Sequence, residues 1–133
     1  ESEGAAARPL LLLHGGMGHS RWWDLVAPAL TDVAHPYALD RRGHGDSDHA
    51  ALYSWDADIR DAVAVMDSIT KAPAPVVGHS KGGGLMMQLA EAMPHRVSHL
   101  VNLDGLPSKR RMPGRVPIKA IGRRPWSSER SRP

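Results

Sequence analysis

The amino-acid sequence predicts an α/β fold, in which a mostly parallel sheet carries helices on both faces. Short apolar runs alternate with segments of helical periodicity in the order β-α-β-α-β-α-β. Each apolar run also ends in glycine and polar residues, which suits the carboxyl ends of parallel strands. The length of 133 residues, with 41% hydrophobic and 23% charged residues, is sufficient for one globular domain.

The first part of the chain supplies two expected strands and one expected helix. The run "RPLLLLHGG" at residues 8–16 is ended by glycines and suits a strand buried on both faces. Residues 20–30 are expected to form a helix with Trp22 on its apolar face, and Pro28 weakens its later turns. The segment "YALD" at 37–40 is expected to be a second buried strand.

The middle of the chain supplies the remaining elements. Apolar residues recur at helical spacing over 54–69, and the serine that opens this segment is a suitable N-cap. The run "APVVGHS" at 74–80 predicts a third strand, and the helix expected at 81–93 is stopped by Pro94. A fourth strand is expected at 97–105.

The four expected strand ends are the polar and glycine-rich points of the sequence. They read "HGG", "DRRGHGDS", "GHSKGG" and "LDG". Because a helix returns the chain between successive strands, the strands run parallel with right-handed crossovers, and their carboxyl ends meet at one edge. Reactive groups are therefore expected at that edge.

One strand end carries a serine between two glycines. Residues 78–82 read Gly78-His79-Ser80-Lys81-Gly82, which matches G-x-S-x-G between a buried strand and a helix. A sharp strand-to-helix turn strains the serine backbone and lifts its hydroxyl clear of the sheet. Side chains in place of Gly78 or Gly82 would collide with neighbouring backbone, so the motif predicts an exposed nucleophile at Ser80.

Backbone amides near this serine are suited to stabilise a negative oxygen. The first amides of the following helix point at the hydroxyl, which makes the Lys81 N–H one expected donor of an oxyanion hole. The second donor is expected from "LHGGMG" at 13–18, as the N–H of Gly16 or of Met17.

Together, these motifs resemble the α/β-hydrolase superfamily over roughly residues 9–106. The resemblance implies a partial α/β-hydrolase fold, whose strands correspond to the family's third through sixth, and an esterase-like activity through an acyl-enzyme at Ser80. It also implies that His14 orients the oxyanion loop and that His44 belongs to a structural turn. His79 points away from the serine hydroxyl.

The acid and the base that the family places after its nucleophile lack a clear counterpart. His95 and His99 are the only histidines after Ser80, and neither is placed like the family's catalytic histidine. Asp104 is a candidate acid, although a strand-end residue bonded to loop amides is the simpler interpretation. The family's first two strands, its cap and its last two strands are also missing, so we expect a truncated and nearly inactive chain.

Charge divides the chain into two expected regions, a partial core at 1–106 and a basic, irregular tail at 107–133. Residues 109–133 hold 9 of the 17 Lys and Arg but 1 of the 14 acids, which gives the tail +8 and residues 1–108 a charge of 8 minus 13, or −5. The alternative function is therefore a non-catalytic fragment or pseudoenzyme whose tail binds an acidic partner. A nucleic acid is not expected, because no recognisable nucleic-acid fold accompanies the tail.

Other classes of chemistry lack support in the sequence. Without cysteine, there is no disulfide, thiolate nucleophile or thiolate-bound metal, and no histidine pair has metal-ligand spacing. No cofactor is expected, and the partner is a small acyl substrate. No apolar run approaches a membrane span, so we expect a soluble, cytoplasmic chain. The uncovered edge of the fourth strand predicts self-association.

Overall fold

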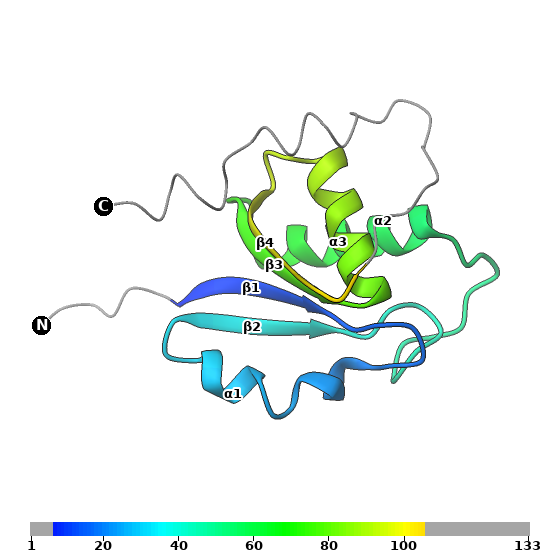
Figure 1. Cartoon of the computed structure of the whole chain (residues 1–133). Helices are drawn as coiled ribbons and strands as arrows, with labels where there is room; N and C mark the ends of the chain where they lie inside the picture. Colours follow the sequence, from blue (N-terminus) through cyan, green and yellow to red (C-terminus); the bar gives the residue numbers. More distant parts are fainter. Residues whose placement is uncertain (1–6, 106–133) are drawn as a thin grey trace, which may run out of the picture.

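The structure, a computed structural model, describes residues 7–105, and within them four strands form one parallel sheet (Figure 1). The strands are β1 (Arg8–Leu13), β2 (Ala34–Leu39), β3 (Ala74–His79) and β4 (Val97–Leu103). The predicted parallel sheet is confirmed. The expected basic tail at 107–133 lies outside the described residues.

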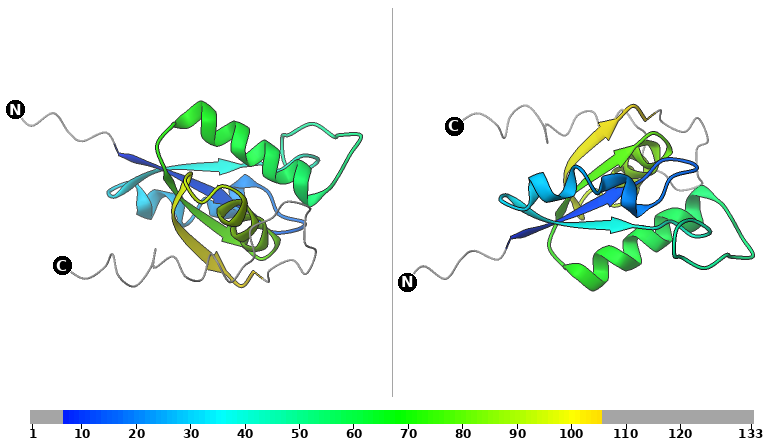
Figure 2. Two further views of the ribbon diagram at one scale, coloured as in Figure 1. Left: turned by 90° about the horizontal axis from the view of Figure 1, so that it is seen from above. Right: turned by 90° about the horizontal axis from the view of Figure 1, so that it is seen from below.

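Helical segments cover both faces of this sheet, as predicted (Figure 2). On one face, α2 (Trp55–Ile69) and α3 (Lys81–Ala92) pack over the larger apolar cluster. On the other face, η1 (Ser20–Trp23) and α1 (Ala27–Leu30) pack over a smaller cluster. Among residues 7–105, no helix combines the length and the apolar character needed to cross a membrane.

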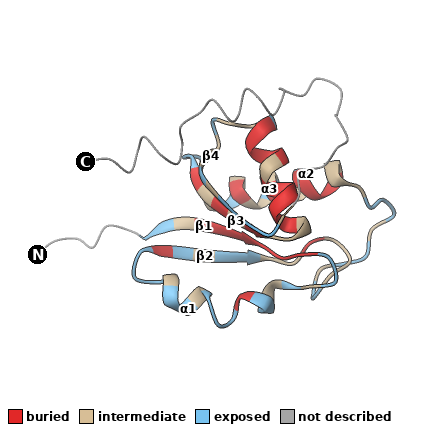
Figure 3. Ribbon diagram, viewed as in Figure 1, coloured by how far each residue is buried: buried red, intermediate tan, exposed pale blue. Residues whose placement is uncertain are grey.

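Strand β1 is buried on both faces, as its sequence predicts. Leu11 and Leu13 belong to the cluster under α2 and α3, whereas Leu10 and Leu12 belong to the cluster under η1 and α1. Burial of each leucine side chain contributes about 2 kcal/mol to folding. In Figure 3 the buried stretch continues from β1 into the loop that follows it, so the start of that loop is held by the core.

The expectation of a second strand buried on both faces is wrong. Strand β2 begins three residues before the expected segment, and Ala34 is its one buried residue, whereas Tyr37 and Ala38 are exposed. The reason is its position, because β2 pairs only with β1 within the described residues and therefore forms an edge of the sheet. Pro36 suits an edge strand, since proline cannot donate to a second neighbour.

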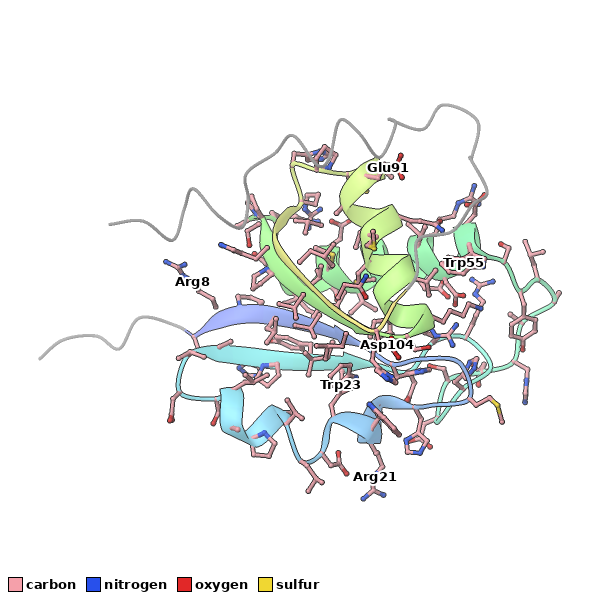
Figure 4. All side chains as sticks on the ribbon, in the orientation of Figure 1. Arg8, Arg21, Trp23, Trp55, Glu91 and Asp104 are labelled. Atoms are coloured by element: carbon pink, nitrogen blue, oxygen red, sulfur yellow. The ribbon has the colours of Figure 1, made fainter. Side chains whose placement is uncertain are left out.

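The single helix expected over 20–30 is replaced by two short pieces, η1 and α1. Proline lacks an N–H and collides with the preceding turn inside a helix, so the chain starts a new helix at Ala27 and places Pro28 in its first turn. The inward residue also differs from the expectation, because Trp23 is 3% exposed and Trp22 is 59% exposed. Figure 4 shows Trp23 directed at the sheet, with Arg21 directed away from it.

Helix α2 forms where its periodicity predicts it. The Ser54 hydroxyl accepts a hydrogen bond from the Ala57 amide at 3.1 Å, which confirms the predicted N-cap. Asp56 and Asp58 lie in the first turn, where negative charge stabilises the helix by interacting with the positive end of its dipole.

The strand order changes direction at β1, because successive strands are added first on one side of β1 and then on the other. The order is β2-β1-β3-β4, so the chain leaves β1 on one side for β2 and returns on the other side for β3. Leu13 is in register with both Leu39 and Gly78, and therefore the three strands end at the same level. In open α/β sheets, ligands bind in the crevice beyond such a reversal, and the residues that follow β1 and β3 meet there.

Candidate active site

Ser80 lies on the sharp turn that joins β3 to α3. Its backbone has φ 53° and ψ −119°, a conformation that non-glycine residues rarely adopt. The surrounding structure fixes it from both sides, because its amide donates to the Leu103 carbonyl at 2.8 Å and its carbonyl accepts from the Gly84 amide at 3.2 Å. The strained strand-to-helix turn that the sequence predicts is therefore present.

The two flanking glycines are required by close backbone contacts. A Cβ atom at Gly78 would clash with the backbone of Gly82, and one at Gly82 would clash with the backbone of Leu13. Helix α3 consequently starts in direct contact with the ends of β1 and β3. This contact confirms the predicted reason for glycine on both sides of Ser80.

The loop after β1 packs against the serine through Gly15. A Cβ atom at Gly15 would lie 3.1 Å from the Ser80 Cβ, so the loop backbone closely covers one side of the serine. A Cβ atom at Gly16, by contrast, would meet no atom within 4 Å. The space beside the Gly16 backbone is therefore open.

Three donors fix the orientation of the Gly15 carbonyl. It accepts hydrogen bonds from His14 Nδ1 at 2.7 Å, from Arg41 Nη2 at 3.1 Å and from the Gly18 amide at 3.3 Å. The N–H of Gly16 belongs to the same trans peptide and points opposite to that carbonyl. It is thus directed away from the buried donors and toward the open side of the loop.

His14 is a fully buried structural residue and not a base. Its Nε2 accepts a hydrogen bond from the Arg41 amide at 3.1 Å, which leaves the proton on Nδ1 for the bond to the Gly15 carbonyl. Burial lowers the pKa of His14, so the ring stays neutral. Both nitrogens are engaged, and these contacts agree with the loop-orienting role that the family resemblance implies.

Three backbone amides near Ser80 are available to a ligand. Among the described residues, the N–H groups of Gly16, Met17 and Lys81 donate no hydrogen bond. Lys81 is the first residue of α3, where amides have no partner within the helix. Met17 has φ 62° and a fully exposed side chain, so it lies at the rim of this site.

The loop after β2 contacts the segment that follows β1 through Asp40. The Asp40 carboxylate accepts hydrogen bonds from the Ser20 amide at 2.5 Å and the Asp46 amide at 3.1 Å. Burial acts to raise the pKa of Asp40, but these amide hydrogen bonds outweigh it and lower the pKa. His44 Nδ1 bonds to the Arg42 carbonyl at 2.9 Å, in agreement with its implied place in a structural turn.

Sequence reasoning missed two charged residues that lie behind the site, Arg41 and Asp58. Arg41 is 2% exposed and Asp58 is 6% exposed, and Arg41 Nη1 lies 3.3 Å from Asp58 Oδ2. Lys81 Nζ lies 3.8 Å from the same carboxylate oxygen. The periodicity of α2 does carry a signal, because Asp58 is adjacent to the core residue Ile59, but its partners come from distant loops.

Within residues 7–105, no histidine side chain is hydrogen-bonded to the candidate nucleophile. All eight histidines of the sequence lie within these residues. His79 instead stacks on Trp22, with ring centroids 5.2 Å apart and planes inclined by 18°. Among these residues, no group of three or more His, Asp or Glu side chains could hold a metal ion.

Asp104 follows β4 at the same edge of the sheet and near the start of α3 (Figure 4). It has φ 57° and an exposed side chain. Within residues 7–105 its carboxylate forms no hydrogen bond or ion pair. Its role as the acid of a catalytic triad stays a prediction.

A parallel sheet with a serine on a strained strand-to-helix turn, beside a glycine loop with available amides, is the arrangement of the α/β-hydrolase class of proteins. The family model of the alpha/beta hydrolase fold matches residues 8–130, and the chain belongs to that family. The match extends beyond the resemblance at 9–106 that the sequence motifs carry. The boundary expected at residue 106 stays a prediction.

Individual relatives are lipases, esterases and other hydrolases. The chain is 41% identical over 96 residues to the lipase LipV of Mycobacterium tuberculosis. This alignment covers 71% of the chain and 36% of the lipase. The chain is 38% identical over 104 residues to a 2-hydroxymuconate semialdehyde hydrolase of a Pseudomonas species, covering 74% of this chain and 37% of that enzyme. The solved structure of a marine microorganism esterase is 30% identical, with a TM-score of 0.74 over 90% of this chain and 45% of the esterase.

The chain therefore spans little more than a third of the length of these two curated relatives, 36% and 37%. The residues that match the family model, 8–130, contain the strand-to-helix turn and both loops described above.

Proposed function

We propose that Ser80 is the nucleophile of a hydrolase that acts on an ester or a related small acyl substrate. The observation that carries the proposal is the positive φ of Ser80 at the start of α3, with the oxyanion loop packed against its Cβ. A hydroxyl held on such a turn is accessible to a carbonyl carbon, and the neighbouring amides are accessible to its oxygen. The lipases and esterases among the relatives support ester chemistry.

The two donors of the oxyanion hole are the amides of Gly16 and Lys81. The Gly15 carbonyl is bonded to His14 and Arg41, so the opposite end of the same peptide presents the Gly16 N–H to the open side. The Lys81 amide is supported by the positive end of α3. Met17 is the alternative to Gly16, because its amide is equally free of partners within the described residues.

In the proposed reaction, Ser80 Oγ bonds to the carbonyl carbon, and the negative charge that develops on the carbonyl oxygen is stabilised by the two amides. The bond to the leaving group then breaks, and the proton of the serine hydroxyl ends on the departing alcohol. Water later attacks the acyl-enzyme and releases the acid. Each proton transfer needs a base, which in serine hydrolases is a histidine.

The chain by itself should react slowly, because no histidine is bonded to Ser80 among residues 7–105 and the sequence beyond them contains none. Oxyanion stabilisation and substrate binding together still accelerate acyl transfer by about 10³- to 10⁴-fold over water in enzymes that have lost a member of their triad. Imidazole added to the solution can supply the missing base.

The test is covalent labelling with a fluorophosphonate in the presence of imidazole, followed by peptide mass spectrometry. We expect modification at Ser80, a rate that rises with imidazole concentration, and no labelling of Ser80→Ala. Ser68→Ala is the matched control, since Ser68 is an exposed serine of α2 whose hydroxyl donates to the Val65 carbonyl at 2.7 Å. Equal labelling of Ser80→Ala and the unmodified chain would refute the assignment.

A further inference from the structure

A buried carboxylate on α2 contacts two cationic side chains, one bonded to the loop of the proposed Gly16 donor and one on Lys81 itself. Asp58 is 6% exposed, and its Oδ2 lies 3.3 Å from Arg41 Nη1 and 3.8 Å from Lys81 Nζ. These two cations come from different segments, the loop after β2 and the start of α3. Asp58 therefore links them.

Arg41 connects Asp58 to the peptide that carries the first proposed oxyanion donor. One end of its guanidinium bonds to Asp58, and its Nη2 donates to the Gly15 carbonyl at 3.1 Å. Because the guanidinium is planar and rigid, the position of the carboxylate fixes the position of the second nitrogen. The Gly15 carbonyl and the Gly16 N–H belong to one rigid peptide, so the link extends to that N–H.

Lys81 carries the second donor on its own backbone. Its side chain lies between the Asp58 carboxylate and the ring of Trp55, with Nζ 5.5 Å from the ring centroid. Trp55, which Figure 4 labels, is the first residue of α2. Asp58 lies in the same first turn. The first turn of one helix thus holds the side chain of the first residue of the other.

We propose that Asp58 is a positioning residue, which sets the orientation of the Gly16 and Lys81 amides relative to each other without contacting the substrate. The inference rests on the proposed function of Ser80 for its catalytic consequence, but the link itself is structural. Removing the charge leaves Arg41 buried without its anion, and a buried cation moves toward water or another acceptor. The Gly15 carbonyl then loses one of its donors, and the Lys81 side chain loses its anchor.

The chain offers a matched control for this carboxylate. Asp61 lies one turn further along α2 and forms a two-pronged pair with Arg42, at 2.7 and 2.9 Å. Arg42 otherwise donates to the Leu52 carbonyl and does not contact the oxyanion loop. Asp61→Asn therefore removes a less buried Arg–Asp ion pair from the same helix and leaves the two donors linked.

The experiment compares Asp58→Asn, Asp61→Asn and Arg41→Lys by two measurements. The first is the rate of imidazole-assisted phosphonylation of Ser80, and the second is the ¹H–¹⁵N spectrum of the full chain. We expect Asp58→Asn to slow phosphonylation about tenfold, a fraction of the 10²- to 10³-fold loss that follows removal of one donor, and to move the amide signals of both Gly16 and Lys81. Asp61→Asn should leave the rate and both signals unchanged.

Arg41→Lys separates the two halves of the link. Lysine keeps the charge but cannot bond to Asp58 and Gly15 with two nitrogens of one plane, so the Gly16 signal should move while the Lys81 signal stays. This variant also decides the matter if Asp58→Asn does not fold. Unchanged rate and signals in Asp58→Asn, equal changes in Asp61→Asn, or an unmoved Gly16 signal in Arg41→Lys would each overturn the proposal. Failure of the unmodified chain to react at Ser80 would instead count against the proposed function, because the amide signals report the link independently.

Discussion

The two faces of the sheet differ in how firmly they are packed, and the candidate active site belongs to the firmer one. On the α2/α3 face, ten buried residues form one apolar cluster. On the η1/α1 face the corresponding cluster has four, under two helical pieces of four residues each. Ser80 begins the long helix of the first face, whereas the second face presents exposed Trp22, Leu25 and Val26. A reactive hydroxyl that must keep its orientation is thus supported by the side with the larger core.

The largest difference expected between two paired variants concerns the contact between α3 and β1. A Cβ atom in Gly82→Ala would lie 2.6 Å from the His14 carbonyl oxygen, and the backbone on both sides would have to separate. Alanine stabilises a helix by about 1 kcal/mol relative to glycine. Any net loss of stability in this variant would therefore be caused by the clash. We expect a loss of about 3 kcal/mol in the free energy of unfolding, measured by urea denaturation.

Gly16→Ala is the control for this comparison, because a Cβ atom there meets nothing within 4 Å. Its stability should stay within about 0.5 kcal/mol of the unmodified chain. A Gly82→Ala chain as stable as Gly16→Ala would mean that α3 is not seated on the end of β1.

A second, smaller difference is expected between equivalent leucines of the two faces. Leu85 and Leu12 are both 0% exposed, and they belong to the larger and the smaller cluster respectively. Leu85→Ala leaves a cavity between long elements that cannot move inward, so it should cost about 4 kcal/mol. Leu12→Ala should cost about 1 kcal/mol less, because the short pieces above it can collapse into the space.

The measurement is the urea midpoint of both variants at constant slope. Equal losses, or a larger loss for Leu12→Ala, would show that the two faces are equally firm and would remove the basis of the comparison.

The two faces also differ in how well their structure could be predicted from the sequence. The α2/α3 face follows from local signals, namely the period of α2, its Ser54 cap and the glycines around Ser80. The η1/α1 face does not, because helical period alone cannot show that Pro28 begins a helix instead of weakening one. The prediction of a single helix therefore placed Trp22 inside, whereas Trp23 is the buried residue in the structure.

The site could be predicted where its residues belong to a recognisable motif, as in the glycine loop at 13–18 and the G-x-S-x-G segment at 78–82. Ser80, Gly78 and Gly82 sit within five positions, and the strained turn follows from their pattern. Asp58 and Arg41 are 17 positions apart, and their meeting depends on how α2 crosses the sheet. A buried ion pair between distant segments leaves no periodic trace in the sequence, so only the fold reveals it.

The smallest expected effect is a pH dependence that originates where the two faces meet, at the end of β1. Burial holds the pKa of His14 below its ordinary value of 6.5, so the unfolded chain binds a proton before the folded chain does. The stability associated with this neutral ring is fully present above pH 6.5 and is lost progressively as the pH falls below it.

In His14→Gln, the amide side chain can still donate and accept but does not titrate. The difference in unfolding free energy between this variant and the unmodified chain should therefore shift in favour of the variant between pH 7 and pH 5. Ser68→Ala, which removes no titrating group, should follow the unmodified chain throughout, and a His14→Gln chain that also follows it would show that the oxyanion loop does not depend on a neutral His14.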